Sequence, residues 1–205
     1  NKKDKATKSY VYGYDPSSRM TVANYSGNGN EDYGISNLSY DANGNILNLV
    51  RKGFKGSNFG NIDQLSYTYT GNHLQKIDDA VTSNLNTKDF RDSVATTDYT
   101  YWSNGNLKSD LNKKISNIEY NTYLNKPKKI TLFNGKELNF NYDGGGALIS
   151  RFITDSTKWV YTPSEIYKDD SLYQISQDEG RITRKSGKYK LEFEYRDLWG
   201  NLRTA

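Results

Sequence analysis

The sequence lacks the residues on which most catalytic and metal sites depend. Among its 205 residues there is no cysteine and a single histidine, His73. Without cysteine there is neither a disulfide framework nor a thiolate zinc site, and one histidine cannot form a multi-histidine metal site. His73 lies in the turn "TGNHL", where we expect a solvated side chain. We therefore predict that the chain is not an enzyme and has no catalytic residue, no metal ligand and no cofactor.

Long apolar runs are also missing. Hydrophobic residues make up 34% of the chain, and no window reaches the roughly 18 apolar residues that a membrane-spanning helix needs, so no membrane span is expected. The basic start, "NKKDKATKSY", has no apolar stretch, so any signal peptide is expected to have been removed. The net charge is +4, but acidic residues interleave with the basic clusters around Lys128 and Lys185, so nucleic acid is not an expected partner.

Tyrosine is what the sequence has in abundance, with 18 copies beside 7 phenylalanines. Many of them fall in a repeated frame of a bulky residue, a spacer, a tyrosine, a short polar turn and an aliphatic residue. The clear copies read "YGYDPSSRM", "LSYDANGNI", "YTYTGNHL", "YTYWSNGNL", "FNYDGGGAL" and "FEYRDLWGNL", and the weaker ones "IEYNTYLNKPKKI" and "WVYTPSEI". The repeat tyrosines are Tyr14, Tyr40, Tyr69, Tyr101, Tyr142 and Tyr195, with Tyr120 and Tyr161 in the weaker copies.

Each copy of the frame predicts a β-hairpin. The bulky residue and the tyrosine are two residues apart, so both side chains lie on one face of a strand. The turn that follows contains residues that tolerate a positive φ, among them Gly44, Gly105 and Gly200. No stretch has a helical stripe, and residues 88–99 favour extended structure. We therefore predict an all-β fold: one domain, residues 1–205, built as a single long antiparallel sheet that curls strongly into a partial shell or open barrel.

The Tyr-Asp pairs of this frame, at Tyr14-Asp15, Tyr40-Asp41 and Tyr142-Asp143, resemble the YD repeat of the RHS family. The last part of the chain, about residues 175–205, is similar to the close of the RHS shell in Bacteroidetes-type members, where "EGR" precedes a "YEY…DHLGNVR" element. Here "ISQDEGRI" precedes "YKLEFEYRDLWGNLR", with Leu198-Trp199 in place of the family's His-Leu pair. The matching residues are Glu179, Gly180 and Arg181, and then Asp197, Gly200, Asn201 and Arg203.

The resemblance implies a secreted or cell-surface bacterial protein of the polymorphic-toxin kind. In that family the sheet spirals into a hollow shell that encloses a C-terminal, often toxic, domain of the same polypeptide, which would be the cargo partner of this chain. A self-cleaving segment follows the shell in many members. Neither that segment nor a toxin domain is recognised in the 205 residues, so the enzymatic part of the family is not carried over.

Acidic residues give no clear site. The pairs Asp78-Asp79 and Asp169-Asp170 are adjacent along the chain, and neighbours in a strand point to opposite faces, which suits acid–base chemistry poorly. The stretch "DANGN" begins like a calcium loop but has Ile46 where the loop glycine belongs and Lys52 where the closing glutamate belongs. Asp41 is instead expected to bind the backbone of its own turn.

Two main functions are compatible with this pattern. The leading one is a non-catalytic structural repeat for encapsulation, scaffolding or display. The alternative is a module that binds carbohydrate or another surface ligand by stacking it on Trp102, Trp159 or Trp199. The same aromatic residues would otherwise form cross-strand ladders. A third hypothesis is self-association through the exposed edges of the sheet.

Overall fold

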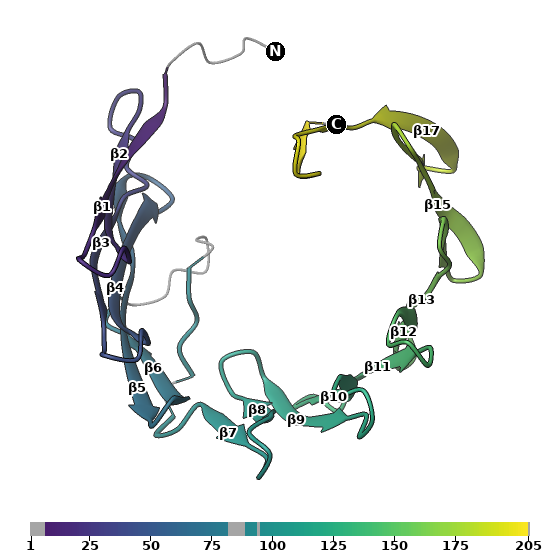
Figure 1. The fold of residues 1–205 in the computed structure, drawn as a ribbon, viewed down its shortest axis with the longest axis horizontal. Helices are drawn as coiled ribbons and strands as arrows, with labels where there is room; N and C mark the ends of the chain where they lie inside the picture. Colours follow the sequence, from purple (N-terminus) through teal and green to yellow (C-terminus); the bar gives the residue numbers. More distant parts are fainter. Residues whose placement is uncertain (1–6, 82–88, 94, 205) are drawn as a thin grey trace. The chain divides into compact units, whose positions relative to one another are not determined.

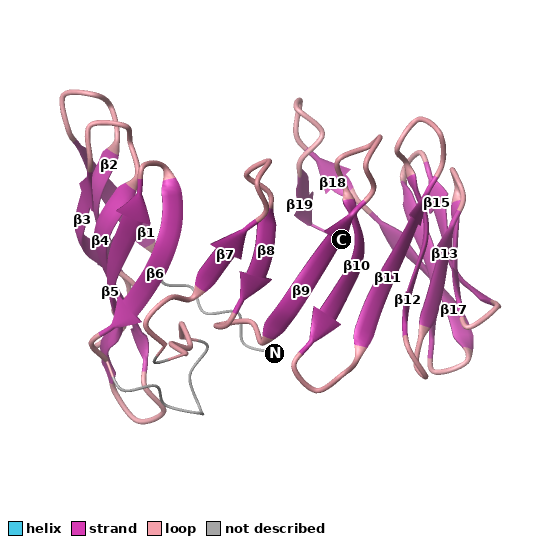
Figure 2. Ribbon diagram, turned by 90° about the horizontal axis from the view of Figure 1, so that it is seen from below, coloured by secondary structure: helices cyan, strands magenta, loops and turns pink. Residues whose placement is uncertain are grey.

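The computed structural model describes residues 7–81, 89–93 and 95–204 and, at the last two of these, the backbone alone. It divides the chain into two compact units, residues 1–113 and residues 114–205. Every regular element of the described residues is a β-strand, as Figure 2 shows, which confirms the predicted all-β class. The strands follow one another along the chain as antiparallel hairpins, and Figure 1 allows each to be followed by colour.

The first unit has one sheet and one further hairpin. Neighbouring strands of the sheet, β1 to β6, lie in the order of the chain and pair antiparallel. β7 and β8 pair with each other. The strands are β1 (Ser9–Tyr14), β2 (Met20–Ser26), β3 (Ile35–Tyr40), β4 (Ile46–Phe54), β5 (Phe59–Thr70), β6 (His73–Asp79), β7 (Tyr99–Tyr101) and β8 (Leu107–Asp110).

The second unit continues the same pattern. β9 to β17 pair in chain order, each antiparallel to the next, and β18 and β19 form a separate two-stranded sheet. The strands are β9 (Ile115–Tyr120), β10 (Pro127–Leu132), β11 (Glu137–Tyr142), β12 (Leu148–Ile153), β13 (Lys158–Tyr161), β14 (Glu165–Lys168), β15 (Ser171–Gln177), β16 (Gly180–Lys185), β17 (Lys188–Phe193), β18 (Tyr195–Arg196) and β19 (Leu202–Thr204).

The strands are distributed over more than one sheet, which differs from the expected single sheet. The six-stranded sheet ends at β6, and β7 begins only after residues 80–98. A tight turn brings two strands into register, whereas a connection of this length leaves the next hairpin free to pair elsewhere. Extended structure was expected over residues 88–99, but residues 89–93 and 95–98 form no strand; residues 88 and 94 lie outside the described residues.

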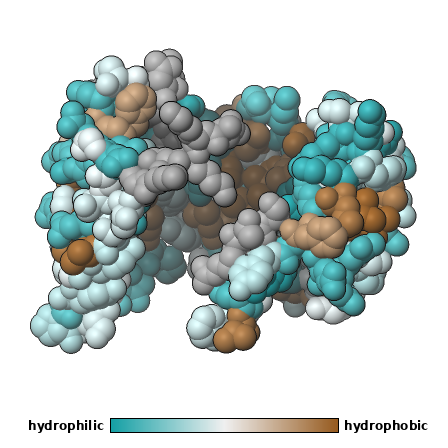
Figure 3. Space-filling model, turned by 90° about the horizontal axis from the view of Figure 1, so that it is seen from above, coloured by the Kyte–Doolittle hydropathy of each residue, from teal (hydrophilic) through white to brown (hydrophobic). Residues whose placement is uncertain are grey.

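The hydrophobic core is small, in keeping with the low content of aliphatic residues. Its main cluster in the first unit consists of Leu65, Ile77 and Tyr99, with Phe90 and other half-buried side chains packed around them. Ala23, Leu38 and Ile62 of the same unit are also buried. The largest fully buried side chains are carboxylates rather than hydrocarbons: Asp63, Asp98 and Asp110. Polar contacts must therefore supply much of the order that a thicker apolar core would provide. On the face shown in Figure 3, hydrophobic residues also reach the surface among hydrophilic ones.

Two of the buried carboxylates attach the connection between β6 and β7 to the sheet. One oxygen of Asp98 accepts the backbone N–H of Ile77 at 2.9 Å, and the other accepts the hydroxyl of Ser93 at 2.6 Å. Asp63 accepts the backbone N–H of Phe90 at 2.7 Å and contacts the guanidinium of Arg51 at 2.5 Å. Each carboxylate thus receives donors from two separate segments, which explains how it can be buried at tolerable cost.

The buried Tyr99 predicts a loss of stability at alkaline pH. Burial raises its pKa to about 12, although the side-chain amide of Asn112 acts in the opposite direction. In the unfolded chain tyrosine ionises near its ordinary value of about 10. Between these values the unfolded state binds fewer protons than the folded state, so the free energy of unfolding falls as pH rises and is fully retained below that window.

Replacing Tyr99 with phenylalanine should make this decline less steep. Urea unfolding at about pH 9 and about pH 11 measures the slope for both proteins. Burial also raises the pKa of Tyr67, Tyr69 and Tyr101, so part of the decline should remain. Tyr123→Phe is the matched control, because that side chain is 96% exposed. Equal slopes for the wild type and Tyr99→Phe would contradict the assignment.

Candidate functional site

The aspartate of each Tyr-Asp pair closes the hairpin turn that follows it. In the second copy, Oδ1 of Asp41 accepts the backbone N–H groups of Asn43 at 2.9 Å and Asn45 at 2.8 Å, and Oδ2 accepts the side-chain amide of Asn45. The side chain of Asn45 is the main reason why the pKa of Asp41 lies below its ordinary value. The predicted bond between Asp41 and its own turn is confirmed. The same two backbone bonds recur at Asp15, Asp143 and Asp197.

The glycine of the turn takes the position with a positive φ. The φ angles are 88° at Gly44, 86° at Gly105 and 81° at Gly200, in the left-handed region that glycine tolerates best. In each turn the glycine N–H donates to the carbonyl oxygen three residues before it, at 2.9 to 3.2 Å. This is the geometry of a type I turn followed by a left-handed residue, a common connection in hairpins. The three glycines are therefore needed for the backbone of the turn.

The tyrosine of the frame links one strand to the strand before it. The hydroxyl of Tyr40 donates to the carbonyl oxygen of Met20 at 2.7 Å, and that of Tyr101 donates to the carbonyl oxygen of Leu74 at 2.7 Å. Tyr142 makes the equivalent bond to Pro127 at 2.9 Å. The other repeat tyrosines differ: Tyr14 is 61% and Tyr195 68% exposed, on the edge strand β1 and in the separate β18–β19 hairpin, whereas Tyr69, Tyr120 and Tyr161 are half-buried.

Polar side chains connect the turns of successive hairpins in the first unit. The guanidinium of Arg19 binds Asp15 within its own turn, donates to the carbonyl oxygen of Asp41 at 2.9 Å and lies 4.7 Å from the ring centre of Tyr40. The next two turns are joined because Oδ1 of Asn72 accepts the side-chain amides of both Asn43 and Asn45 at 3.0 Å.

The sole histidine continues this row of turns. The ring of His73 meets the ring of Tyr101 edge-on, with 4.8 Å between centres, and so connects the third turn to the fourth. The side chain is exposed, as expected, although His73 is the first residue of β6 and directly follows the turn rather than lying in it. Its contact is thus with the neighbouring hairpin.

The bond from Tyr40 to Met20 should have a measurable effect on stability. Tyr40→Phe removes one hydrogen bond to a half-buried carbonyl group and should lower the free energy of unfolding by about 1 kcal/mol. Tyr14→Phe is the control, since Tyr14 holds the same place in the repeat but is 61% exposed. Chemical denaturation of both variants checks this, and losses of equal size would count against an anchoring role for the hydroxyl.

The closing motif is accounted for by packing and turn geometry. Gly180 is buried at the start of β16, opposite Phe193 of β17. Arg181 forms ion pairs with Glu192 at 3.0 Å and Glu194 at 3.3 Å. Asp197, Gly200 and Asn201 form the turn between β18 and β19, with the carboxylate bound to Asn201 as Asp41 is to Asn45. Glu179 is exposed, its carbonyl oxygen accepting the N–H of Glu194, and the side chain of Arg203 lies outside the described residues.

Three of the basic residues near the end of the chain contact the same carboxylate. Glu192 is contacted by Arg181 at 3.0 Å, by Lys185 at 2.5 Å and by Lys190 at 4.0 Å. The hydrogen bond from Lys185 is the main reason why the pKa of Glu192 lies below its ordinary value. These contacts favour cross-strand ion pairing over a basic patch for nucleic acid.

The carboxylates of the paired acidic residues also form hydrogen bonds and ion pairs within the protein. Asp79 accepts the N–H of Gln64 at 2.9 Å and that of Val81 at 3.0 Å, while Asp78 forms an ion pair with Lys76. Asp169 accepts the N–H of Lys158, whose ammonium lies 3.5 Å from Asp170. Within the described ranges, no group of three histidine or acidic side chains is placed to hold a metal ion. Those ranges also contain no helix long and apolar enough to cross a membrane.

The three tryptophans lie in different surroundings. Trp102 is 39% exposed in the turn after β7, with the ammonium of Lys108 4.6 Å from its ring centre. Trp199 is 82% exposed in the turn between β18 and β19. Trp159 is half-buried on β13 and meets Tyr173 edge-on, with 5.0 Å between ring centres. The structure therefore does not bring the three together, and Trp159 has the largest set of described contacts with cationic and aromatic side chains.

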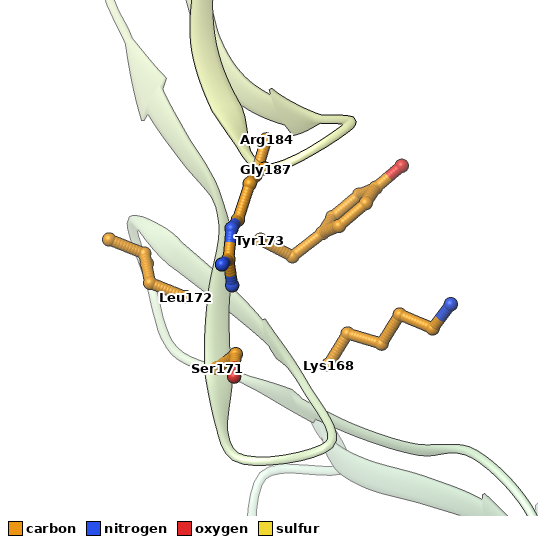
Figure 4. Close-up of a pocket in the computed structure, with 6 residues that line it drawn as sticks. All are labelled: Lys168, Ser171, Leu172, Tyr173, Arg184 and Gly187. Carbon is orange, nitrogen blue, oxygen red and sulfur yellow. The ribbon is translucent and has the colours of Figure 1, made fainter.

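We define the Trp159 cluster as Arg151, Trp159, Lys168, Tyr173 and Arg184. The guanidinium of Arg151 and the ammonium of Lys168 each lie 5.6 Å from the ring centre of Trp159. Beside Tyr173 there is a hollow of about 240 Å³, drawn in Figure 4, which is lined by Lys168, Ser171, Leu172, Tyr173, Arg184 and Gly187.

Sequence reasoning considered Trp159 but did not connect it with the other four members of the cluster. The members lie on five successive strands, β12 to β16. Their proximity depends on the register of four strand pairs, and the alternation of side chains gives the face of a strand but not its register. One signal in the sequence could have indicated this proximity. The hairpins between residues 148 and 185 are joined by short turns, and short turns place successive strands side by side.

Comparisons with known proteins give little further information. No family model and no curated protein matches the chain. Among solved structures, the chain is similar to a crystal structure of TcdB2-TccC3 without its hypervariable C-terminal region, with a TM-score of 0.32 and 14% identity. The match covers 95% of this chain but 16% of that one, so the chain spans about a sixth of its neighbour's length.

Proposed function

We propose that the chain is a non-catalytic structural domain of the YD-repeat kind, part of a secreted or cell-surface bacterial protein. Its role is encapsulation, scaffolding or display, and its partner is a cargo segment of the same polypeptide. The observation that carries the proposal is the row of turn-to-turn contacts, Arg19 to Asp41, Asn43 and Asn45 to Asn72, and His73 to Tyr101. These contacts join one hairpin to the next by the side chains of the repeat frame itself.

The use of the polar groups supports a structural role. Asp15, Asp41, Asp143 and Asp197 bind turn backbone, and Asp63 and Asp98 bind the connection between β6 and β7. A catalytic carboxylate needs access to a substrate, whereas these oxygens are occupied by intramolecular donors. The core is small and the hairpins follow one another in a ladder, so the chain exposes a large surface relative to the volume that it buries. Such a surface suits a scaffold or a wall.

The test uses the complete polypeptide in its own host. Residues 7–204 are deleted, and intact cells are treated with a protease that does not enter them. The scaffold role predicts that the complete protein reaches the cell exterior and that its segments outside residues 7–204 resist cleavage. The deletion should abolish the delivery, the protection or both. A cytoplasmic protein that stays uncleaved shows that the cells are intact. Equal delivery and equal protection without the repeat, or substrate turnover by the purified chain, would contradict the proposal.

A further inference from the structure

The Trp159 cluster has three cations without an acidic partner. No carboxylate of the residues that the structure describes forms an ion pair with Arg151, Lys168 or Arg184. The neighbouring cations Arg181 and Lys185 behave differently, because both contact Glu192. Uncompensated positive charge is therefore concentrated at this part of the second unit.

The sheet holds these cations around aromatic rings. Trp159 is the cross-strand partner of Arg151 on one side and of Lys168 on the other, and Lys168 is in turn opposite Ser171. Tyr173, two residues after Ser171, packs edge-on against Trp159. Two antiparallel neighbours thus place one cation on each side of a single indole ring.

Arg184 completes the arrangement from β16. Figure 4 shows its side chain extending toward Ser171, across the hollow from Lys168 and beside the ring of Tyr173. The hollow therefore has an aromatic wall in Tyr173, with two cationic groups at its rim and one hydroxyl, while Leu172 adjoins it from the other side of the strand. A cavity with an apolar wall and a few convergent polar groups is the usual form of a site for a small ligand or a single sugar unit.

We propose that this hollow binds a saccharide that carries a carboxylate, such as a uronic acid unit within a polysaccharide. The apolar C–H face of the sugar ring packs against Tyr173, and the carboxylate lies between Arg184 and Lys168. A guanidinium can bind a carboxylate through two parallel hydrogen bonds, and an ammonium adds a second charge. Ser171 lines the same hollow, and its hydroxyl can form a hydrogen bond with a hydroxyl of the sugar. This binding role is independent of the scaffold proposed above.

The surrounding charges favour a single anionic group over an extended polyanion. Asp169 and Asp170 directly follow Lys168 in the chain and are held in place by Lys158. A nucleic-acid strand needs a cationic groove that follows its phosphates over several nucleotides, and here it would meet the two aspartates. A sugar with one carboxylate occupies the hollow without reaching them.

The experiment is calorimetric titration of the whole chain with two oligosaccharides that each contain one uronic acid unit, galacturonate or guluronate, among neutral sugars. The galacturonate oligosaccharide with its carboxylate methyl-esterified removes only the charge, and an oligothymidylate tests nucleic acid. We expect binding of at least one acidic oligosaccharide, weaker binding with added salt, and none of the esterified form. No binding of either acidic sugar, equal binding of the ester, or tighter binding of the oligothymidylate would overturn the proposal.

Three variants assign the binding to this site. Arg184→Gln and Trp159→Ala should each weaken binding by about tenfold or more. The first variant loses a charge-assisted hydrogen bond to the carboxylate, and the second loses the ring that positions Lys168. Trp102→Ala is the matched control, because Trp102 also lies beside a lysine but does not line this hollow, and it should bind as the wild type does. Thermal unfolding shows which variants are folded. Arg184 is exposed, so Arg184→Gln should fold and still tests the site if Trp159→Ala does not fold. An equal loss in all three variants would contradict the assignment.

Discussion

Replacing Gly180 with alanine is expected to separate β17 from β16. A Cβ atom at this position would lie 2.1 Å from the carbonyl oxygen of Glu192 and 3.0 Å from the Cα of Phe193, and both are backbone atoms of the paired strand. The φ angle of 157° is a further obstacle to an L side chain. Since backbone atoms must move, we expect the free energy of unfolding of the second unit to fall by about 3 kcal/mol.

Two other glycines separate the steric effect from the backbone effect. Gly200 has a φ of 81° and open space around its Cβ position, so Gly200→Ala should cost about 1 kcal/mol through backbone strain alone. Gly144 has open space and no positive φ, so its replacement should have no effect. Chemical denaturation measures the losses, and hydrogen exchange of the β17 amides locates them. If Gly180→Ala and Gly200→Ala lost the same stability, the close approach of β16 and β17 would not be the cause.

The second large effect is expected at Asp98, whose side chain is 0% exposed. Asp98→Ala leaves the backbone N–H of Ile77 and the hydroxyl of Ser93 without their acceptor inside the protein. Each buried donor that loses its partner costs about 1–3 kcal/mol. We therefore expect the free energy of unfolding of the first unit to fall by about 3 kcal/mol, as measured by urea denaturation.

Asp98→Asn and Asp178→Ala are the companion variants. The asparagine keeps one acceptor oxygen, so its loss should be intermediate between the wild type and alanine. Asp178 is exposed in the turn before Gly180, and its removal should change stability by no more than about 0.5 kcal/mol. A fully stable Asp98→Ala protein would show that Asp98 does not attach the connection between β6 and β7 to the sheet.

The strand boundaries were the part of the fold that local sequence predicted best. Tyr14, Tyr40 and Tyr142 are each the last residue of a strand, and Met20, Ile46 and Leu148 each begin the next one. The reason is that a hairpin depends on residues that are neighbours along the chain: alternating side chains, an aspartate that binds the turn and a glycine with a positive φ. The resemblance drawn from the Tyr-Asp pairs rests on the same local geometry.

The candidate sites were less accessible to sequence reasoning. Trp102, Trp159 and Trp199 were equivalent candidates from composition, yet only Trp159 has cations on both neighbouring strands and a hollow beside its aromatic partner. The buried carboxylates Asp63 and Asp98 were not anticipated, because their partners Phe90 and Ile77 are separated from them by 27 and 21 positions. Contacts over such distances are not encoded in the periodicity of a strand.

The sequence by itself determined that this protein is a succession of antiparallel hairpins with tyrosines at the strand ends, since each hairpin is specified within a few consecutive residues. Only the tertiary structure decided how those hairpins are divided into sheets, which turns contact each other and which cations gather around Trp159. The physical reason is that these features depend on register and on long-range burial, where one step along a strand moves every side chain to the opposite face.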